Sequence, residues 1–198
     1  SGTIIYYKDT GLVPEIFNST ILEHLKGQAA IGHVLYTTDV GNRENVQPIV
    51  VKYKSGQMAM SYNGSLINTS ALRQKLEEKG AIFQTNNDPE LIASLISIYR
   101  ITSGEIEDAI VKVMEDIKGA YSFILMTQNK LIAVRDPFGM KPLCLGKLDN
   151  SYIVASESSA IDAVGGTLLR DINPGEIVVI QENGIRSIQT EVPGKTGL

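Results

Sequence analysis

A short polar run in the middle of the chain combines two groups that could stabilise a negatively charged reaction intermediate. In Tyr62-Asn63-Gly64-Ser65, the side-chain amide of Asn63 and the backbone N–H of Gly64 could direct two hydrogen bonds at one point. Two such donors are what an oxyanion hole requires in acyl transfer. An Asn-Gly pair is also common in ordinary turns, so the residues by themselves leave both interpretations open.

Asp88 is a second candidate, because it precedes a Pro-Glu pair in a sequence that is typical of a helix start. Its carboxylate could cap that helix, or it could bind a substrate amine. The two roles are compatible, since a carboxylate has several acceptor positions and a cap uses only some of them.

A third candidate is the apolar run that contains His33 and continues through Tyr36 and Thr38 into a polar loop. Polar residues at the end of a strand are a common place for binding groups, because the strand fixes them and the loop exposes them. From the residues alone we favour a structural role, in which His33 is a buried histidine with one hydrogen bond and the threonines end the strand.

The single cysteine, Cys144, lies in an apolar run with no neighbouring base or cation that would lower the pKa of its thiol. We therefore predict an inert core side chain. One cysteine cannot form a disulfide within the chain, which is typical of proteins in the reducing cytoplasm. Cys144, His24 and His33 are too few and too scattered for a structural zinc site, so we expect no metal site.

Composition limits the partners that the chain could have. The 198 residues carry 18 basic and 22 acidic side chains, for a net charge of -4, without a cluster of Lys and Arg. We therefore expect no nucleic-acid partner. The apolar runs are far shorter than the roughly 20 residues of a membrane helix, and the N-terminal residues do not form an export signal, so we also expect no membrane partner.

The first half of the chain mixes strand and helix patterns that would position these residues. Runs rich in β-branched and aromatic residues predict strands, and Lys54-Ser55-Gly56 predicts a hairpin between two of them. Capping residues followed by apolar residues at helical spacing predict helices. The predicted strands cover 3–7, 29–36, 48–53 and 57–62, and the predicted helices cover 15–26, 71–79 after Asn68, 88–99 and 105–118, the last opened by Ser103.

From residue 120 onward, short runs of alternating pattern predict antiparallel strands. They cover 120–127, 131–135, 142–148, 151–156, 176–180 and 185–189, with one short helix at 156–164. Strands, then a block of helices, then strands again predict an α+β fold of antiparallel sheets. Because no repeat or linker divides the chain, we predict one domain over residues 1–190 and a linker or tail over 191–198.

Eight segments resemble, in order and at matching separations, the glutaminase domain of the amidophosphoribosyltransferases. These are class II glutamine amidotransferases of the N-terminal nucleophile hydrolase family. The segment ENVQP favours this branch, because the branch that aminates sugar phosphates normally has a histidine-rich sequence there. The segments are KDTGLVPEIF, IGHVLYTT, ENVQP, YNGSLIN, GAIFQTNND, DPFGMKPLCLGKL, ASESSAIDAVG and RDINPGEIVVI.

The resemblance implies a four-layer α/β/β/α sandwich and a reaction in which an N-terminal cysteine attacks the side-chain amide of glutamine. By position, it implies that Asn63 and Gly64 are the oxyanion donors and that Tyr36, Thr38 and Asp88 bind glutamine. The ammonia would pass to a phosphoribosyltransferase domain that forms phosphoribosylamine, the first step of purine synthesis. No cofactor is implied for this chain, whereas the parent protein would need magnesium and, in some members, an iron-sulfur cluster outside this region.

Several positions depart from the family pattern. The chain begins after the family's first strand, first helix and nucleophilic cysteine, and Ser1 leads into what resembles an interior strand, so we expect an incomplete domain without its nucleophile. Leu35 stands where the family has an Arg that binds the α-carboxylate of glutamine, so we expect weak glutamine binding. Tyr62 replaces a usual His, and Lys141 replaces a usual Arg.

Two functions lead at this point, and a third, weaker possibility is a different amidotransferase branch, such as glutamate synthase or an enzyme that aminates sugar phosphates. The first is a glutaminase-domain fragment of an amidophosphoribosyltransferase-like enzyme, inactive as this chain. The alternative is a pseudo-glutaminase that serves as a binding or regulatory module, which Leu35 and Tyr62 favour because both remove polar groups from the pocket. A strand edge left unpaired by the missing first strand would also favour a homo-oligomer.

Overall fold

Two antiparallel sheets form the centre of the protein. The computed structural model describes residues 2–35 and 45–192. The larger sheet has the strand order β1-β2-β3-β4-β8-β9, and the smaller has the order β6-β5-β7. The strands are β1 (Ile49–Tyr53), β2 (Gly56–Leu66), β3 (Gly119–Met126), β4 (Leu131–Arg135), β5 (Cys144–Leu148), β6 (Ser151–Ala155), β7 (Thr167–Asp171), β8 (Glu176–Gln181) and β9 (Gly184–Gln189). The helices are α1 (Val13–Ile16), α2 (Ser19–His24), α3 (Thr69–Glu77), α4 (Asp88–Tyr99), α5 (Ile106–Asp116) and α6 (Ser158–Ala163).

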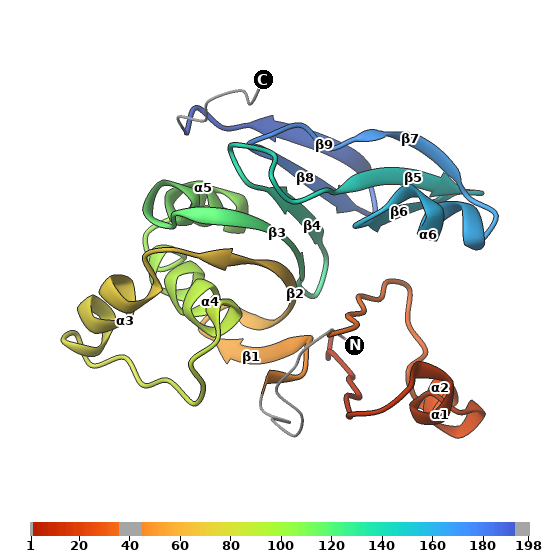
Figure 1. Cartoon of the computed structure of the whole chain (residues 1–198), viewed down its shortest axis with the longest axis horizontal. Coiled ribbons are helices and arrows are strands. Elements are labelled where there is room, and N and C mark those ends of the chain that lie inside the picture. Colours follow the sequence, from red (N-terminus) through yellow and green to blue (C-terminus); the bar gives the residue numbers. More distant parts are fainter. Residues whose placement is uncertain (1, 36–44, 193–198) are drawn as a thin grey trace.

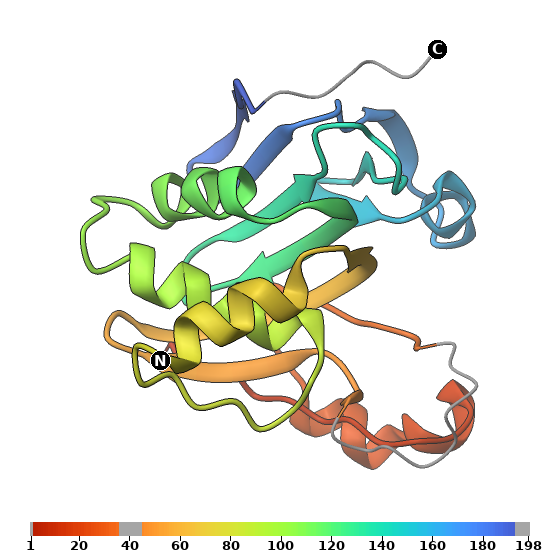
Figure 2. The ribbon, with the colours of Figure 1, turned by 60° about the vertical axis from the view of Figure 1, so that its left-hand side comes forward.

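The sheets and helices form four layers in the order α/β/β/α. Helices α4 and α5 pack on one face of the larger sheet, and their buried side chains share one core with β2, β3, β4 and β8. The smaller sheet packs on the other face through a second, smaller core. Helix α6 contacts all three strands of the smaller sheet on its outer side (Figures 1 and 2). This arrangement confirms the predicted α+β sandwich of antiparallel sheets.

Alternation along the central strands explains the layers, because successive residues of a strand point to opposite faces of the sheet. On β4, Ile132 and Val134 belong to the core on the helix side, whereas Ala133 belongs to the core between the sheets. On β5, Leu145 faces the larger sheet and Gly146 faces α6. A Cβ at position 146 would lie 2.7 Å from the Ile161 side chain, so glycine lets α6 pack closely on the strand.

Most elements predicted after residue 47 are confirmed. The β1–β2 hairpin turns where expected, with Tyr53 paired to Gly56. Helix α5 begins later than predicted, because Glu105 is its N-cap and the backbone N–H of Glu105 donates to the Asp108 carboxylate, so Ser103 does not open the helix. Strand β7 was not predicted, since its side chains are mostly exposed and its sequence does not alternate; β5 supplies its partner.

The two strands predicted near the N-terminus are wrong for the described residues. Neither 3–7 nor the described part of 29–36 is a strand. A strand needs a neighbour that completes its hydrogen-bond ladder, and no described strand pairs with either segment. The backbone N–H of Ile4 donates instead to the side chain of Gln57, at 3.2 Å.

The helix predicted over 15–26 is divided into the short helices α1 and α2. Asn18 separates them, because its side-chain oxygen accepts a hydrogen bond from the backbone N–H of Ile21 and so caps α2. None of the helices in the described ranges is long and apolar enough to cross a membrane. Most of the predicted tail, from 193 onward, lies outside the described residues.

Candidate active site

The predicted site residues gather at one exposed edge of β2. Strand β1 pairs with β2 only as far as Ile49 and Met60, so β2 continues past the end of β1. Strand β3 covers the other edge of β2 up to Leu66. The stretch Tyr62–Leu66, on the side that β1 leaves uncovered, is called the open edge below. Backbone groups there can form hydrogen bonds with side chains or with a ligand.

The backbone N–H of Gly64 points to the open edge. Alternate residues of a strand direct their N–H groups the same way. On one side of Gly64, the N–H of Tyr62 donates to the side-chain oxygen of Gln47, at 2.7 Å. On the other side, the N–H of Leu66 donates to Oδ2 of Asp88, at 2.9 Å. In the part of the chain that the structure describes, no side chain accepts a hydrogen bond from Gly64 between them.

Position 64 cannot hold a side chain. A Cβ there would lie 2.4 Å from the carbonyl oxygen of Ala120 and 2.8 Å from Cα of Tyr121, both in the backbone of β3. The Asn-Gly pair is also not a turn, because Asn63 and Gly64 both lie inside β2, opposite Ser122 and Tyr121. The turn interpretation left open by the sequence is therefore wrong, and glycine is required for the close approach of two strands.

Asn63 presents an exposed amide beside this N–H. Its neighbour Tyr62 belongs to the core on the helix side, so alternation directs the Asn63 side chain to the opposite face of the sheet. Asn63 is exposed, and no described residue forms a hydrogen bond with its side chain. Two predicted donors, one at the strand edge and one on the face, thus lie on adjacent residues and are open to a ligand.

Asp88 does not cap α4, in contrast to one of its two predicted roles. The cap is Asn87, whose side-chain oxygen accepts a hydrogen bond from the backbone N–H of Glu90, at 3.1 Å. Asp88 is the first residue of the helix, and its carboxylate is directed instead at the end of β2.

The Asp88 carboxylate joins three elements. Its Oδ2 accepts hydrogen bonds from the Tyr62 hydroxyl, at 3.0 Å, and from the Leu66 N–H. Its Oδ1 accepts one from Oγ1 of Thr69, the first residue of α3, at 2.7 Å. A carboxylate has about four acceptor positions, so roughly one remains, on Oδ1. Asp88 can therefore stabilise the fold and still accept a further hydrogen bond.

Tyr62 is a neutral donor in this group. Burial, followed by the charge of Asp88 and the hydrogen bond to it, raises the pKa of the Tyr62 hydroxyl well above its ordinary value. The hydroxyl stays protonated and donates to Asp88. Where the family usually has a His, Tyr62 thus donates to the Asp88 carboxylate from a hydroxyl that stays uncharged throughout the physiological pH range.

The remaining predicted residues are placed less completely. Tyr36 and Thr38 lie outside the described residues. Leu35 is 40% exposed and offers no donor. His33 is half-buried, and its Nε2 lies 3.5 Å from Nε2 of Gln47, which agrees with the structural role that the residues alone favour.

Cys144 does not take part in this site. Its side chain is buried, and the thiol donates to the carbonyl oxygen of Ala155, at 3.3 Å. Burial, together with the charges of Asp171 and Glu157, raises the pKa of the Cys144 thiol. A thiol with a raised pKa and no access to solvent is a poor nucleophile, as the sequence predicts.

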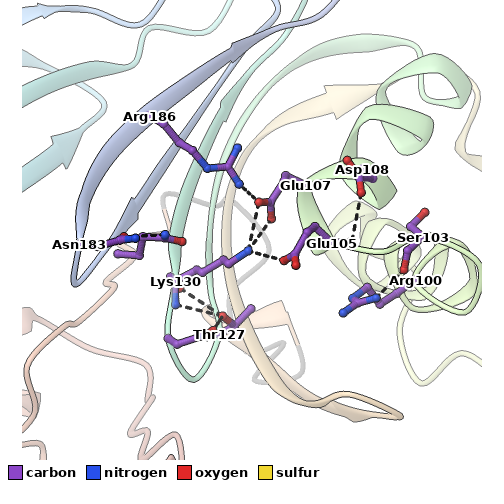
Figure 3. Close-up of polar contacts among 11 residues, drawn as sticks. Arg100, Ser103, Glu105, Glu107, Asp108, Thr127, Lys130, Asn183 and Arg186 are labelled. Carbon is purple, nitrogen blue, oxygen red and sulfur yellow. Dashed lines mark hydrogen bonds and ion pairs between the residues drawn. The ribbon is translucent and has the colours of Figure 1, made fainter.

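Other polar features lie away from the open edge. A cavity of about 710 Å³ is lined by Tyr53, Arg100 and Lys130, among others, and contains none of the predicted site residues. It adjoins a cluster of ion pairs in which Glu107 contacts Lys130 and Arg186 (Figure 3). Within 2–35 and 45–192, no group of three His, Cys, Asp or Glu side chains could hold a metal ion.

Comparison with known proteins agrees with this geometry. A family model described as a glutamine amidotransferase domain matches residues 33–163, which include Asn63, Gly64 and Asp88. The fold and the site together define a glutamine amidotransferase domain, and the chain belongs to that family.

Within the family, the chain is similar to the amidophosphoribosyltransferases. It is 42% identical to the Archaeoglobus fulgidus enzyme over 180 residues, and 42% identical to the Bacillus subtilis enzyme over 183 residues. These alignments cover 90% and 91% of this chain, but 39% and 38% of those enzymes. The chain therefore spans about two fifths of the length of the relatives that it matches.

Solved structures confirm the fold. The B. subtilis glutamine phosphoribosylpyrophosphate amidotransferase, in complex with ADP and GMP, superposes with a TM-score of 0.82 at 41% identity, over 90% of this chain and 38% of that one. A structure described as the allosteric regulatory enzyme of purine biosynthesis gives a TM-score of 0.84 at 42% identity, with the same coverage. The sandwich of N-terminal nucleophile hydrolase type, expected from the resemblance, is confirmed.

Two residues of the site were not identified from the sequence. Gln47 binds both backbone groups of Tyr62, and Thr69 binds Asp88. For Gln47 the only signal was its place in the ENVQP segment, which served to choose a family branch. Thr69 gave no signal of a role in the site, because it only precedes the helix predicted over 71–79.

Proposed function

We propose that the chain is the glutaminase part of an amidophosphoribosyltransferase, which hydrolyses glutamine and supplies ammonia for phosphoribosylamine synthesis in the cytoplasm. The open edge carries this proposal. The N–H of Gly64 lies two residues along β2 from the N–H of Leu66, which donates to the Asp88 carboxylate. Alternate residues of a strand are roughly 6.8 Å apart. Four covalent bonds, about 5 Å when extended, separate the ammonium nitrogen of glutamine from its carboxamide carbon. The length of glutamine therefore suits a span between the two groups.

In this proposal the remaining acceptor position of Asp88 binds the α-ammonium group of glutamine. The amide of Asn63 and the N–H of Gly64 hydrogen-bond the carboxamide oxygen and hold it more strongly when it becomes an oxyanion. The family pattern assigns Tyr36 and Thr38 to the same pocket. Asn63, Gly64 and Asp88 are positions of the family pattern that lie at or beside the open edge. Tyr36 and Thr38 are positions of the family pattern that follow Leu35 in the sequence.

The nucleophile is assigned to an N-terminal cysteine of the full-length protein, with its own α-amine as base, and not to Cys144. The thiolate sulfur attacks the carboxamide carbon, the C–N bond breaks, and ammonia leaves with a proton from the base. Water then cleaves the thioester, which releases glutamate and regenerates the thiol. Asn63 and Gly64 stabilise the oxyanion in both steps.

Glutamine hydrolysis by the full-length protein that contains this chain tests the proposal. We expect ammonia and glutamate in equal amounts from glutamine, and far less turnover of asparagine, whose side chain is one methylene too short to join Asp88 to the oxyanion donors. We expect no turnover by the 198-residue chain alone. Hydrolysis by the isolated chain that survives replacement of Asn63, or none by the full-length protein, would contradict the proposal.

A second candidate is a pseudo-glutaminase that binds a ligand without catalysis. Leu35 favours it, because its exposed side chain cannot bind a carboxylate. Loss of a bidentate charged contact removes on the order of 2 kcal/mol or more of binding. Calorimetric titration of glutamine separates the candidates: ordinary enzyme affinity together with hydrolysis supports the glutaminase, and the absence of both supports the binding module.

A further inference from the structure

Gln47 makes an unusual set of contacts for a residue outside any strand. Its side chain is 8% exposed. The side-chain oxygen accepts a hydrogen bond from the backbone N–H of Tyr62, at 2.7 Å, and the side-chain nitrogen donates to the backbone oxygen of Tyr62, at 3.1 Å. One carboxamide thus forms the two hydrogen bonds that a neighbouring strand would form with this residue.

These contacts continue the ladder where β1 stops. Met60 is paired with Ile49, and Tyr62 is the next residue of β2 that faces the same way. Without Gln47, both backbone groups of Tyr62 would be left unpaired in a buried position. Each unpaired buried group costs about 1–3 kcal/mol. Gln47 therefore fixes the backbone directly before Asn63 and Gly64.

The orientation of the Gln47 amide is also held from its other side. The side-chain nitrogen of Gln47 also lies 3.5 Å from Nε2 of His33, so its second hydrogen can be directed there. Burial lowers the pKa of His33, which favours the neutral imidazole near pH 7, and its Nε2 accepts this hydrogen in the tautomer protonated at Nδ1. A rotated amide would place its oxygen against the Tyr62 oxygen, so one orientation is strongly preferred.

We propose that Gln47 is a positioning residue for glutamine hydrolysis: it fixes the open edge of β2 so that the donors of Asn63 and Gly64 are aimed at the oxyanion. This inference rests on the proposed glutaminase function. Gln47 does not touch the substrate. It acts through the backbone of Tyr62, and its effect appears in the rate of the chemical step, because only the transition state depends fully on donor alignment.

Gln47→Met in the full-length protein tests this role, since Met has a similar length and lacks both hydrogen-bonding groups. Loss of one oxyanion donor costs about 10²–10³ in kcat, so misalignment should cost about 10–100-fold, with KM for glutamine changed less than about threefold. The matched control is Gln57→Met on the same strand, which removes the hydrogen bond from Ile4 at the far end of β2. The control should change kcat less than about twofold.

Gln47→Glu tests whether the hydrogen bonds to Tyr62 carry the effect, and not only the shape of the side chain. A protonated Glu has the same acceptor and donor as Gln, whereas an ionised Glu places a negative oxygen against the Tyr62 oxygen. The ratio of kcat for Gln47→Glu to kcat for the wild type should therefore rise as pH falls. Amide hydrogen exchange at Tyr62, whose N–H donates to Gln47, should be faster in Gln47→Met than in Gln57→Met.

The outcomes are distinct. A wild type that hydrolyses glutamine, with Gln47→Met at undiminished kcat or Gln47→Glu at a pH-independent ratio, overturns the positioning role and leaves the proposed function intact. Parallel losses of kcat and of the folded fraction, measured by thermal unfolding, also overturn it. A wild type without glutaminase activity overturns the proposed function and the positioning role together.

Discussion

Gly64 serves both the fold and the proposed chemistry. The missing side chain allows β3 to approach β2, and the backbone N–H faces the open edge. Asp88 combines roles in the same way, because three of its acceptor positions hold β2 and α3 together and the remaining one is available to a ligand. At this scale, structural and functional interpretations of a residue are compatible.

Gly64→Ala should destabilise the protein by about 3 kcal/mol, because the new Cβ would overlap backbone atoms of β3 that cannot rotate away. Gly32→Ala is the matched control, since no atom lies within 4 Å of a Cβ there. We expect the control to change stability by less than about 1 kcal/mol. Urea unfolding of both variants measures the difference, and equal stabilities would show that β2 and β3 are not so closely paired.

Residue types could predict only part of this site. Asn63, Gly64 and Asp88 could be named because an amide, a bare backbone and a carboxylate have recognisable chemistry. The role of Gln47 could not, because its contact with Tyr62 joins segments 15 residues apart through a side chain that replaces a strand. No local sequence pattern indicates that a side chain takes the place of a neighbouring strand.

At the scale of elements, the first turn of α5 is held by charges as well as by apolar packing. Glu107 is 2% exposed, and it pairs with Lys130 next to β4 and with Arg186 of β9 (Figure 3). Lys130 also contacts Glu105, which is 61% exposed. One buried carboxylate therefore connects the helix layer to two strands of the larger sheet.

Glu107→Gln should cost about 2–4 kcal/mol, because the largely buried Lys130 loses its buried partner and keeps only the exposed Glu105. Arg186 contributes less to this cost, since its side chain is 45% exposed. Glu105→Gln is the control at the neighbouring position. It should cost less than about 1 kcal/mol, since an exposed ion pair is weak. Denaturant unfolding of the two variants under identical conditions tests this, and a similar cost for both would refute a special role of the buried carboxylate.

Elements with local signals were predictable, and elements that depend on a partner were not. The β1–β2 hairpin follows from a short glycine-containing turn between two apolar runs. Residues 3–7 have the same strand-forming composition, yet no described strand pairs with them. Strand β7 shows the opposite case, because β5 offers an edge and β7 pairs with it despite a poor sequence pattern.

At the scale of the whole molecule, apolar packing joins the two sheets, and within the described residues an ion pair between the partly exposed Arg170 and the buried Glu176 adds to it. Arg170 of β7 donates two hydrogen bonds to Glu176 of β8, at 2.7 and 2.8 Å. Burial by itself would raise the pKa of Glu176, but the hydrogen bonds from Arg170, Ser187 and the Asn173 backbone outweigh it, so the pKa is lowered. The charged form therefore stabilises the contact between the sheets.

The pH dependence follows from this lowered pKa. Because the pKa of Glu176 is lower in the folded state, its contribution is fully present above the ordinary carboxyl pKa and is lost as pH falls through the lowered value. In Glu176→Gln, the free energy of unfolding should decline less steeply than in the wild type between about pH 6 and pH 3. Identical slopes in urea unfolding series would show that Glu176 does not contribute.

The central claim is that Asn63 and Gly64 stabilise an oxyanion during glutamine hydrolysis. The most direct measurement is kcat and KM for glutamine in the full-length protein and its Asn63→Ala variant, with the exposed hairpin variant Asn183→Ala as control. We predict that Asn63→Ala lowers kcat by about 10²–10³ with little change in KM, while the control is unaffected. An unchanged kcat in Asn63→Ala would contradict the account.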